Sequence, residues 1–578
     1  MISIKSVKLY FRESSSAMFG IFLILWAILS LLQARFTPIN SDEAYYWMYS
    51  RYLDWGYFDH PPMIALMIKI GYFFFKYELG VRLVGILFQL LSFYLIWCMV
   101  DSDLKKNKKN VLLLILIISS LPIFNIFGFI ATPDSPLLFF TALFLFIYRK
   151  FDLNNNWKNT LFLGIVMAAI MYSKYHGALL IILVIISNLK LLRNPKFYIA
   201  CVLALILFMP HIYWQYSNDF PSIKYHLVDR VAGFHLKNVI EYFLNELATH
   251  NPLVLPVVIY LMFRVRHLSS FERTLYFIFI GFFTFFFISS FRYHVEPQWT
   301  AVASIPMVII LFNHLDYKPK ISAYLKYATI ISIVLILFLR SAMMIDFLPI
   351  DYFRTTYHGT KKWAQDIEKI AGNKPVVFTN SYQRASKYTF YTKKFSYTLN
   401  SLSYRKNQFD LWDFEEQLHG KEVLYAPHFL TDYYKQSLEK YITSRGDTIY
   451  ARDFTDFQSL QKECIILDKN EYHFSKKEQC LLPMQLYNPY PYQINLDHPV
   501  FPVRFQVCFF TNGVLKYNKG FEFSDKIKIL NVGDSIKTIG SFKVNDIPAG
   551  RYKLAICSES GIEYDVCNSK FKDVTISE

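Results

Sequence analysis

The chain has 578 residues, of which 53% are hydrophobic and 18% charged, and its formal net charge is +16 at pH 7. A mean hydropathy of +0.23, with charged residues below the roughly 25% of soluble domains, excludes an ordinary soluble protein. In a membrane protein such basicity indicates cytoplasmic loops and anionic lipid headgroups, and no aromatic–basic module supports binding to nucleic acid.

The first apolar run begins at Met18 and follows the basic residues Lys5, Lys8 and Arg12. A signal peptide has the same charge pattern, but no small-x-small cleavage site follows, and residues 33–35 are a poor one. We therefore expect an uncleaved first membrane helix with its N-terminus in the cytoplasm.

Apolar segments recur up to residue 342 and then stop. Several are shorter than a standard span of ~20 residues, and together they predict about eleven spans. Residues 61–77 carry Lys69 and Lys76, which favours a helix at the membrane interface before the next span. The predicted spans are residues 17–34, 80–100, 111–130, 134–149, 160–173, 178–192, 197–214, 252–264, 274–290, 298–313 and 324–342.

Basic residues gather in every second loop between these spans. Such loops face the cytoplasm, so the remaining loops must face outward. The outward loops contain the acids, histidines and aromatic residues of 42–62, 132–134, 173–177, 214–230 and 292–299. The basic residues are Lys105, Lys106, Lys108 and Lys109; Arg149, Lys150 and Lys158; Lys190, Arg193 and Lys196; Arg264, Arg266 and Arg273; and Lys318 and Lys320.

The C-terminal part of the chain is soluble in character. An odd number of spans with the N-terminus inside places it outside the membrane. Helix-like and strand-like runs alternate at first, and short alternating strands with turn signals follow. We therefore predict a transmembrane domain over residues 1–345, an extracytoplasmic α/β domain over 346–470 and a β-rich, sandwich-like domain over 471–578.

Five of the seven cysteines lie in this last part of the chain, and Cys98 and Cys201 lie in apolar spans. No CxxC spacing indicates zinc. If the region is exported, one or two disulfides can form, and the candidate pairs are Cys464 with Cys480 and Cys557 with Cys567.

The first outward loop begins with Asp42 and Glu43, directly after the first span. One interpretation is a helix start, with Ser41 as N-cap and two acids in the first turn. The other is chemical, because an acid at the bilayer surface can meet a lipid-borne substrate. The two are compatible, since a cap holds a carboxylate in place.

Other ionisable residues recur on the same side. His60 precedes Pro61-Pro62 and Asp134 follows Thr132-Pro133, and each is typical of a helix start or of a functional site. A snorkelling lysine or an interfacial arginine explains each cation singly. Together these cations can form a pocket for an anionic group such as a phosphate; they are His60, Arg82, Lys174 and Arg292.

These motifs resemble those of polytopic glycosyltransferases of the C-type fold, in particular the bacterial lipid A aminoarabinose transferases and the protein O-mannosyltransferases. Asp42-Glu43 is similar to the acidic pair of the first outward loop, and Asp134 in "TPDSPLLFF" to the second acidic element. His60 stands where the aminoarabinose branch has a lysine. The remaining matches are "YFDHPPM" (57–63), "MYSKYHGALL" (171–180), "PHIYWQYSNDF" (210–220) and "EPQWTAVASIP" (296–306).

The resemblance implies a sugar donor on a polyprenyl phosphate, transfer at the periplasmic face of the bacterial inner membrane, and inversion at the sugar carbon. The acceptor is a lipid, a glycan or a protein. A phosphate leaving group needs positive charge and the acceptor hydroxyl needs a base. The expected roles are Asp42 as base with Glu43 orienting it, Asp134 positioning the acceptor or a cation, Arg82, His60, Lys174 and Arg292 on the donor phosphate, and Tyr57, His176 and His294 lining the pocket.

Three questions stay open at this stage. Asp42 and Asp134 can instead bind a divalent cation, for which carboxylates are suitable ligands. A transporter or flippase of lipid-linked saccharides can use the same outer pocket, although no repeat of the chain supports it. An envelope scaffold would leave both acids dispensable.

Overall fold

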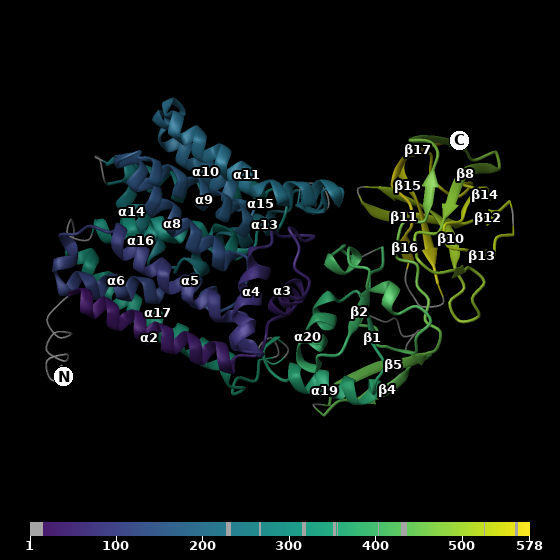
Figure 1. Cartoon of the computed structure of the whole chain (residues 1–578), viewed down its shortest axis with the longest axis horizontal. Coiled ribbons are helices and arrows are strands. Elements are labelled where there is room, and N and C mark those ends of the chain that lie inside the picture. Colours follow the sequence, from purple (N-terminus) through teal and green to yellow (C-terminus); the bar gives the residue numbers. More distant parts are fainter. Residues whose placement is uncertain are drawn as a thin grey trace. The chain divides into compact units, whose positions relative to one another are not determined.

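A computed structural model describes residues 15–578 except 227–232, 265–267, 315–318, 351–353, 355, 403, 429–435, 445, 512, 525 and 561–564. The predicted basic residues Lys5, Lys8, Arg12, Arg266 and Lys318 lie outside the described residues. The chain forms two compact units, residues 1–360 and 361–578. Figure 1 shows the first as a helical bundle and the second as the part that holds the strands.

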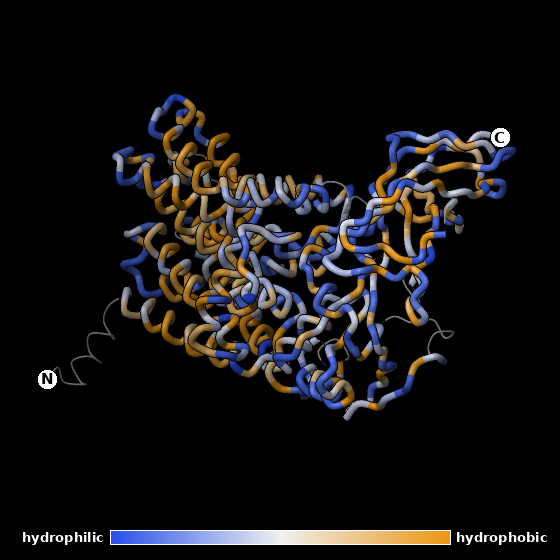
Figure 2. The backbone as a smooth tube through the Cα atoms, turned by 45° about the vertical axis from the view of Figure 1, so that its right-hand side comes forward, coloured by the Kyte–Doolittle hydropathy of each residue, from blue (hydrophilic) through white to orange (hydrophobic). Residues whose placement is uncertain are grey.

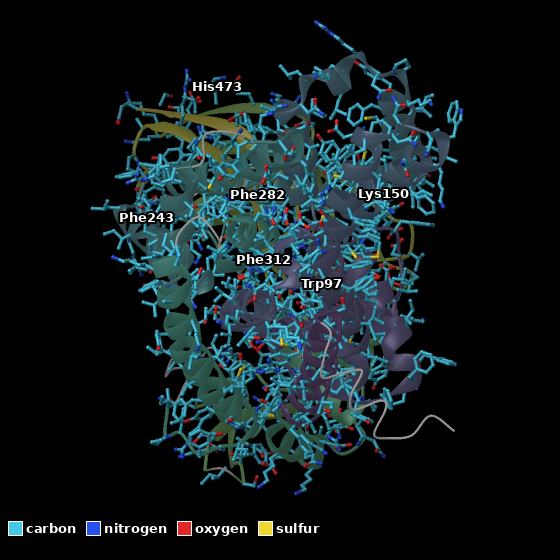
Figure 3. All side chains as sticks on the ribbon, turned by 90° about the vertical axis from the view of Figure 1, so that its left-hand side faces the viewer. Trp97, Lys150, Phe243, Phe282, Phe312 and His473 are labelled. Carbon is cyan, nitrogen blue, oxygen red and sulfur yellow. The ribbon has the colours of Figure 1, made fainter. Side chains whose placement is uncertain are left out.

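Helices account for the regular structure of the first unit. Apolar residues cover most of them, as Figure 2 shows in orange, and Phe282 and Phe312 lie buried among them (Figure 3). The helices are α2 (Ser15–Phe36), α3 (Ser41–Arg51), α4 (Met63–Phe74), α5 (Glu78–Met99), α6 (Lys108–Ser120), α7 (Pro122–Ile126), α8 (Asp134–Leu153), α9 (Trp157–Ser173), α10 (His176–Ser187), α11 (Pro195–Ser217), α12 (Pro221–Lys224), α13 (Leu236–Thr249), α14 (Leu255–Met262), α15 (Ser270–Ser290), η4 (Pro297–Ala303), α16 (Ser304–Asn313) and α17 (Pro319–Met344).

Five of the described helices are long and apolar enough to cross a membrane: α2, α5, α11, α15 and α17. Shorter apolar helices are α4, α10 and the continuous run from η4 through α16. The predicted span at 111–130 is two helices, because Pro122 begins α7 and cannot continue the hydrogen-bonding of α6. A multi-pass helical membrane fold is therefore confirmed, and the number of spans is not.

The basic loops meet at one end of the bundle. Arg149 at the end of α8 donates to Met99 O at the end of α5 (2.8 Å), and Arg273 at the start of α15 donates to Ser187 O at the end of α10 (2.9 Å). Asn313 after α16 accepts from Asp101 N (2.9 Å). Loops that the alternation predicts to be on one side thus share hydrogen bonds.

The second unit contains several β-sheets. The first has the order β2 (Ser396–Leu399), β1 (Val376–Thr379), β3 (Val423–Tyr425), β5 (Thr448–Phe454), β4 (Glu439–Ile442), with β1 parallel to both β2 and β3. Helix α19 (Thr360–Ala371) precedes β1 in the chain, and helix α20 (Tyr382–Thr392) connects β1 to β2. This is the α/β arrangement that the alternating runs predicted.

The remaining sheets follow in the last part of the chain, as the turn-rich sequence predicted. One contains β11 (Val514–Gly520), β10 (Arg504–Thr511), β15 (Gly550–Glu559), β17 (Lys572–Ser577) and β7 (Glu471–Ser475), with β16 (Asp565–Cys567) on β15. Another contains β12 (Glu522–Phe523), β14 (Ser535–Phe542), β8 (Cys480–Tyr487) and β6 (Ile465–Leu467), and β13 (Ile529–Leu530) pairs with β9 (Ile494–Asn495).

Glu415 joins the α/β part of this unit to the β-rich part. Its Oε1 accepts from Ser459 Oγ (2.6 Å) and Gln461 N (2.9 Å), and its Oε2 accepts from Tyr490 Oη (2.7 Å). Burial raises the pKa of Glu415 above its ordinary value, although these hydrogen bonds act in the opposite direction.

Candidate functional site

Helix α3 presents Asp42 at the end of the bundle opposite to the basic loops. Asn40, not Ser41, is its N-cap, because the Asn40 side chain accepts from Asp42 N and the Glu43 carboxylate accepts from Asn40 N in a capping box. The prediction that Ser41 caps the helix is therefore wrong by one residue. Asp42 is exposed in the first turn, whereas Glu43 beside it is fully buried.

Glu43 forms a buried ion pair with Arg82 of α5. Arg82 Nε lies 2.7 Å from Glu43 Oε1, and Nη2 lies 2.6 Å from Oε2, which is a bidentate pair. The remaining guanidinium N–H groups donate to the carbonyls of Ala34, Thr37 and Pro38. All five N–H donors of Arg82, which was predicted to bind the donor phosphate, thus have acceptors within the protein.

The same carboxylate reaches the loop before α8. Ala131 N donates to Glu43 Oε1 at 2.8 Å, three residues before Asp134. Phe129 of this loop lies below the guanidinium groups of Arg82 and Arg340, each 5.5 Å from its ring centroid. The Glu43 carboxylate on the first turn of α3 thus contacts both helix α5 and the loop before Asp134.

Asp134 is the first residue of α8 and pairs with Lys174, which follows α9. The Lys174 Nζ–Asp134 Oδ1 distance is 2.7 Å, and both side chains are buried. No side-chain cap precedes Asp134, so Thr132 is not an N-cap. The structure thus joins two of the predicted site residues that are 40 positions apart.

The loop after α3 is held by its own aromatic residues. Asp59 is buried and accepts from Tyr49 Oη (2.6 Å), and the Tyr49 and Tyr57 rings stack at 4.0 Å. Tyr57 Oη donates to Tyr49 O and Tyr52 O. Tyr57, which was predicted to line a pocket, is fully buried. His60, half-buried, lies edge-on to the Tyr46 ring.

The C-terminal end of α11 is hydrogen-bonded to this loop. His211 contacts Tyr175 Oη at 3.0 Å and Trp55 O at 2.7 Å, and Trp214 Nε1 donates to Asp54 (2.7 Å). Gln215 donates to Tyr175 Oη and Ser222 Oγ. The Pro210–Phe220 motif thus anchors the loop after α3.

The remaining predicted residues lie around η4. His176 is half-buried between the rings of Phe286 and Trp299. His294 is exposed, with Nδ1 3.2 Å from a Glu241 carboxylate oxygen. Arg292 is exposed, and it has no ion pair with the part of the chain that the structure describes.

Sequence reasoning missed a buried acid on α13, Glu246, and a buried histidine directly after this helix, His250. Glu246 Oε2 accepts from Thr300 Oγ1 (2.6 Å) and lies 3.2 Å from His250 Nδ1. Glu246 Oε1 and His250 Nε2 have no hydrogen-bond partner among the described residues. Their i, i+4 spacing on an amphipathic helix was the signal that could have identified them.

A divalent cation does not fit these residues well. Within the described ranges, no group of three or more His, Cys, Asp or Glu side chains is arranged to hold a metal ion. Asp134 already faces the Lys174 ammonium.

Known proteins are similar to this chain in sequence and in fold. Residues 59–214 match the family model described as dolichyl-phosphate-mannose-protein mannosyltransferase. The lipid A galacturonosyltransferase RgtD of Rhizobium johnstonii is 23% identical over 267 residues, which are 43% of this chain and 54% of that protein. This chain thus matches about half the length of that curated relative.

Two solved structures of ArnT from Cupriavidus metallidurans share the fold. The apo structure aligns with a TM-score of 0.54 at 14% identity, and the structure bound to undecaprenyl phosphate with 0.56 at 15% identity. Each alignment covers 75% of this chain and 98% of the other. The resemblance to C-type membrane glycosyltransferases that the motifs predicted is confirmed.

Proposed function

We propose that this protein is an integral-membrane glycosyltransferase that moves a sugar, with inversion, from a polyprenyl-phosphate donor to a lipid, glycan or protein acceptor at the periplasmic face of the bacterial inner membrane. The observation that carries the proposal is the position of Asp42. It is exposed in the first turn of a helix that the buried Glu43–Arg82 pair holds in place.

Asp42 is the proposed general base. The acceptor hydroxyl must lose a proton as it attacks the sugar carbon, and a carboxylate fixed at the outer end of the bundle can accept it. Glu43 is buried and bound to Arg82 and Ala131, so it acts through position and does not touch the substrate. Asp134, in its ion pair, positions Lys174 and the start of α8.

The donor phosphate leaves as a stable anion, so the site needs positive charge where that anion develops. Lys174 has one described acceptor for its three N–H groups, and exposed Arg292 has no described ion pair. We assign the phosphate to these two cations and to His60, with His176 and His294 beside them. The undecaprenyl phosphate bound by a structural relative supports a lipid-phosphate donor.

We also propose that the chain crosses the membrane about eleven times, as the sequence predicts. The clustering of the basic loops at one end of the bundle supports it, since such loops stay in the cytoplasm. The site residues then face the periplasm, as does the C-terminal region. Within that region we retain the division into an α/β domain, 346–470, and a β-rich domain, 471–578.

The test is transfer in vitro from a polyprenyl-phosphate-linked sugar, with wild type compared with Asp42→Asn. Loss of a general base should lower the rate about 10²- to 10⁴-fold with unchanged folding. Asp219→Asn is the matched control, because Asp219 is an exposed acid that pairs with Lys224 after α11. An unchanged rate in Asp42→Asn would exclude Asp42 as base. Saccharide movement across vesicles without transfer would favour the flippase.

A further inference from the structure

Three cysteines of the second unit lie on neighbouring strands. Cys557 of β15 is directly opposite Cys567 of β16 in the antiparallel register. Cys508 of β10 is opposite Ala555, two residues before Cys557 on β15. Because side chains alternate along a strand, Cys508 and Cys557 point to the same face. Together with Phe510, Cys508 and Cys557 lie in one small buried cluster, and Cys567 packs against it.

We propose that Cys557 and Cys567 are joined by a disulfide in the mature protein, with Cys508 as a third thiol that stays reduced. The inference rests on the proposed periplasmic location of residues 361–578, because disulfides persist in that compartment.

The register selects this pair. Directly opposite residues of an antiparallel ladder have Cα atoms about 4.5–5.5 Å apart, which lies within the 4.4–6.8 Å range of disulfides. Diagonal residues such as Cys508 and Cys557 are about 7–8 Å apart, which is beyond it. Cys464 and Cys480, the other pair that the sequence offered, are both buried, and Cys464 lies just before β6 whereas Cys480 begins β8.

The different exposure of the two thiols indicates which cysteine reacts first. Cys567 is half-buried and Cys557 is 1% exposed. Hydrogen bonding to Cys557 lowers the pKa of the Cys567 thiol. A Cys567 thiolate can therefore attack one sulfur of a periplasmic protein disulfide, whose S–S bond breaks; a mixed disulfide forms and the other sulfur of the oxidant leaves as a thiolate. Cys557 then attacks Cys567 Sγ, and the oxidant leaves as a dithiol that carries the two electrons.

The bond would fix a weak part of the sheet. Strand β16 has only three residues, and it is separated from β17 by the irregular segment at Asn568 and Ser569. There Asn568 N donates to Ile556 O, and Ser569 Oγ accepts from Ile556 N. A disulfide at Cys567 would hold β16 against β15, where only three residues are paired through the backbone.

The test uses the full-length protein in isolated membranes. Free thiols are alkylated under denaturing conditions, the remaining disulfides are then reduced and labelled with a second reagent, and the peptides are identified by mass spectrometry. We expect the second label on Cys557 and Cys567, and the first label on Cys508, Cys464 and Cys480. Cys567→Ser should move Cys557 to the first label, whereas Cys480→Ser should change neither residue.

Protease added to spheroplasts separates the two possible failures. If residues 361–578 are digested and Cys557 and Cys567 still carry the first label, the disulfide is wrong and the location stands. If these residues are protected, the location itself is wrong. A Cys508–Cys557 link in wild type would also overturn the pairing.

Discussion

The Glu43 carboxylate and the Arg82 guanidinium form a two-point ion pair with N–O distances of 2.7 and 2.6 Å, in which neither side chain is exposed by more than 1%. The pair joins α3 to α5, and through Ala131 it also holds the loop that leads to Asp134. A buried charge without its partner is far more costly than the intact pair.

Glu43→Gln and Arg82→Met should each destabilise the protein by about 3–5 kcal/mol, because each leaves one buried charge unpaired. The double variant should lose less than the sum of the two. Denaturant unfolding of the detergent-purified variants measures this coupling in a double-mutant cycle. Additive losses would mean that the pair does not act as a unit.

The Asp134–Lys174 pair allows stability to be separated from donor binding. Lys174→Met leaves Asp134 buried and unpaired, so we expect lower stability and also weaker donor use. In Asp134→Asn with Lys174→Met, stability should largely return, whereas the KM for the donor should stay raised by about tenfold or more. Full recovery of the KM in the double variant would exclude a contact between Lys174 and the phosphate.

Gly56 tests the packing of the loop after α3 against α11. A Cβ at Gly56 would lie 2.3 Å from the Trp214 ring, which must then shift away from Asp54. Gly56→Ala should cost about 1–3 kcal/mol and reduce activity. Gly20→Ala is the control, because nothing lies within 4 Å of the added Cβ. Trp214→Leu in the Gly56→Ala background should relieve the clash but not restore the hydrogen bond to Asp54.

Glu415 should give the second unit a pH-dependent stability. Its pKa is raised in the folded state, so folding favours the protonated carboxyl. Stability should therefore fall as the pH rises from the ordinary pKa through the raised one, and the loss should persist above it. Glu415→Gln should flatten this dependence, and Glu416→Gln, whose parent residue pairs with Lys462, should keep it. Calorimetry between about pH 4 and pH 8 measures both.

The order of polar motifs along the chain predicted which residues gather at one end of the bundle, and two of them, Asp134 and Lys174, are in contact. Asp134 and Lys174 were both expected on the outer side because the basic loops alternate with the polar ones. Their ion pair was not predictable, since no periodicity connects residues on different helices. The ion pair of Arg82 was not predictable for the same reason: its partner Glu43 is 39 positions away. Asn40 and Ser41 are both good N-caps, so the sequence alone did not decide between them.

The fold was predicted where the local pattern was strong. The α/β part and the strand-rich end of the chain follow from their alternation, and α6 and α7 separate at a proline that the sequence displays. The link through Glu415 was not predictable, because Ser459 and Tyr490 reach it from distant segments. Short helices such as α10 and α14 also prevent the number of membrane spans from being counted by helix length.

The two buried ion pairs also set the local charge balance of the outer end. Glu43 is neutralised by Arg82, and Asp134 by Lys174. An unpaired carboxylate 5 Å from an incoming phosphate would repel it by about 3 kcal/mol at an effective dielectric constant of 20. Because both acids are compensated within the protein, the buried carboxylates would not oppose the lipid-phosphate donor of the proposed function on its way to Asp42.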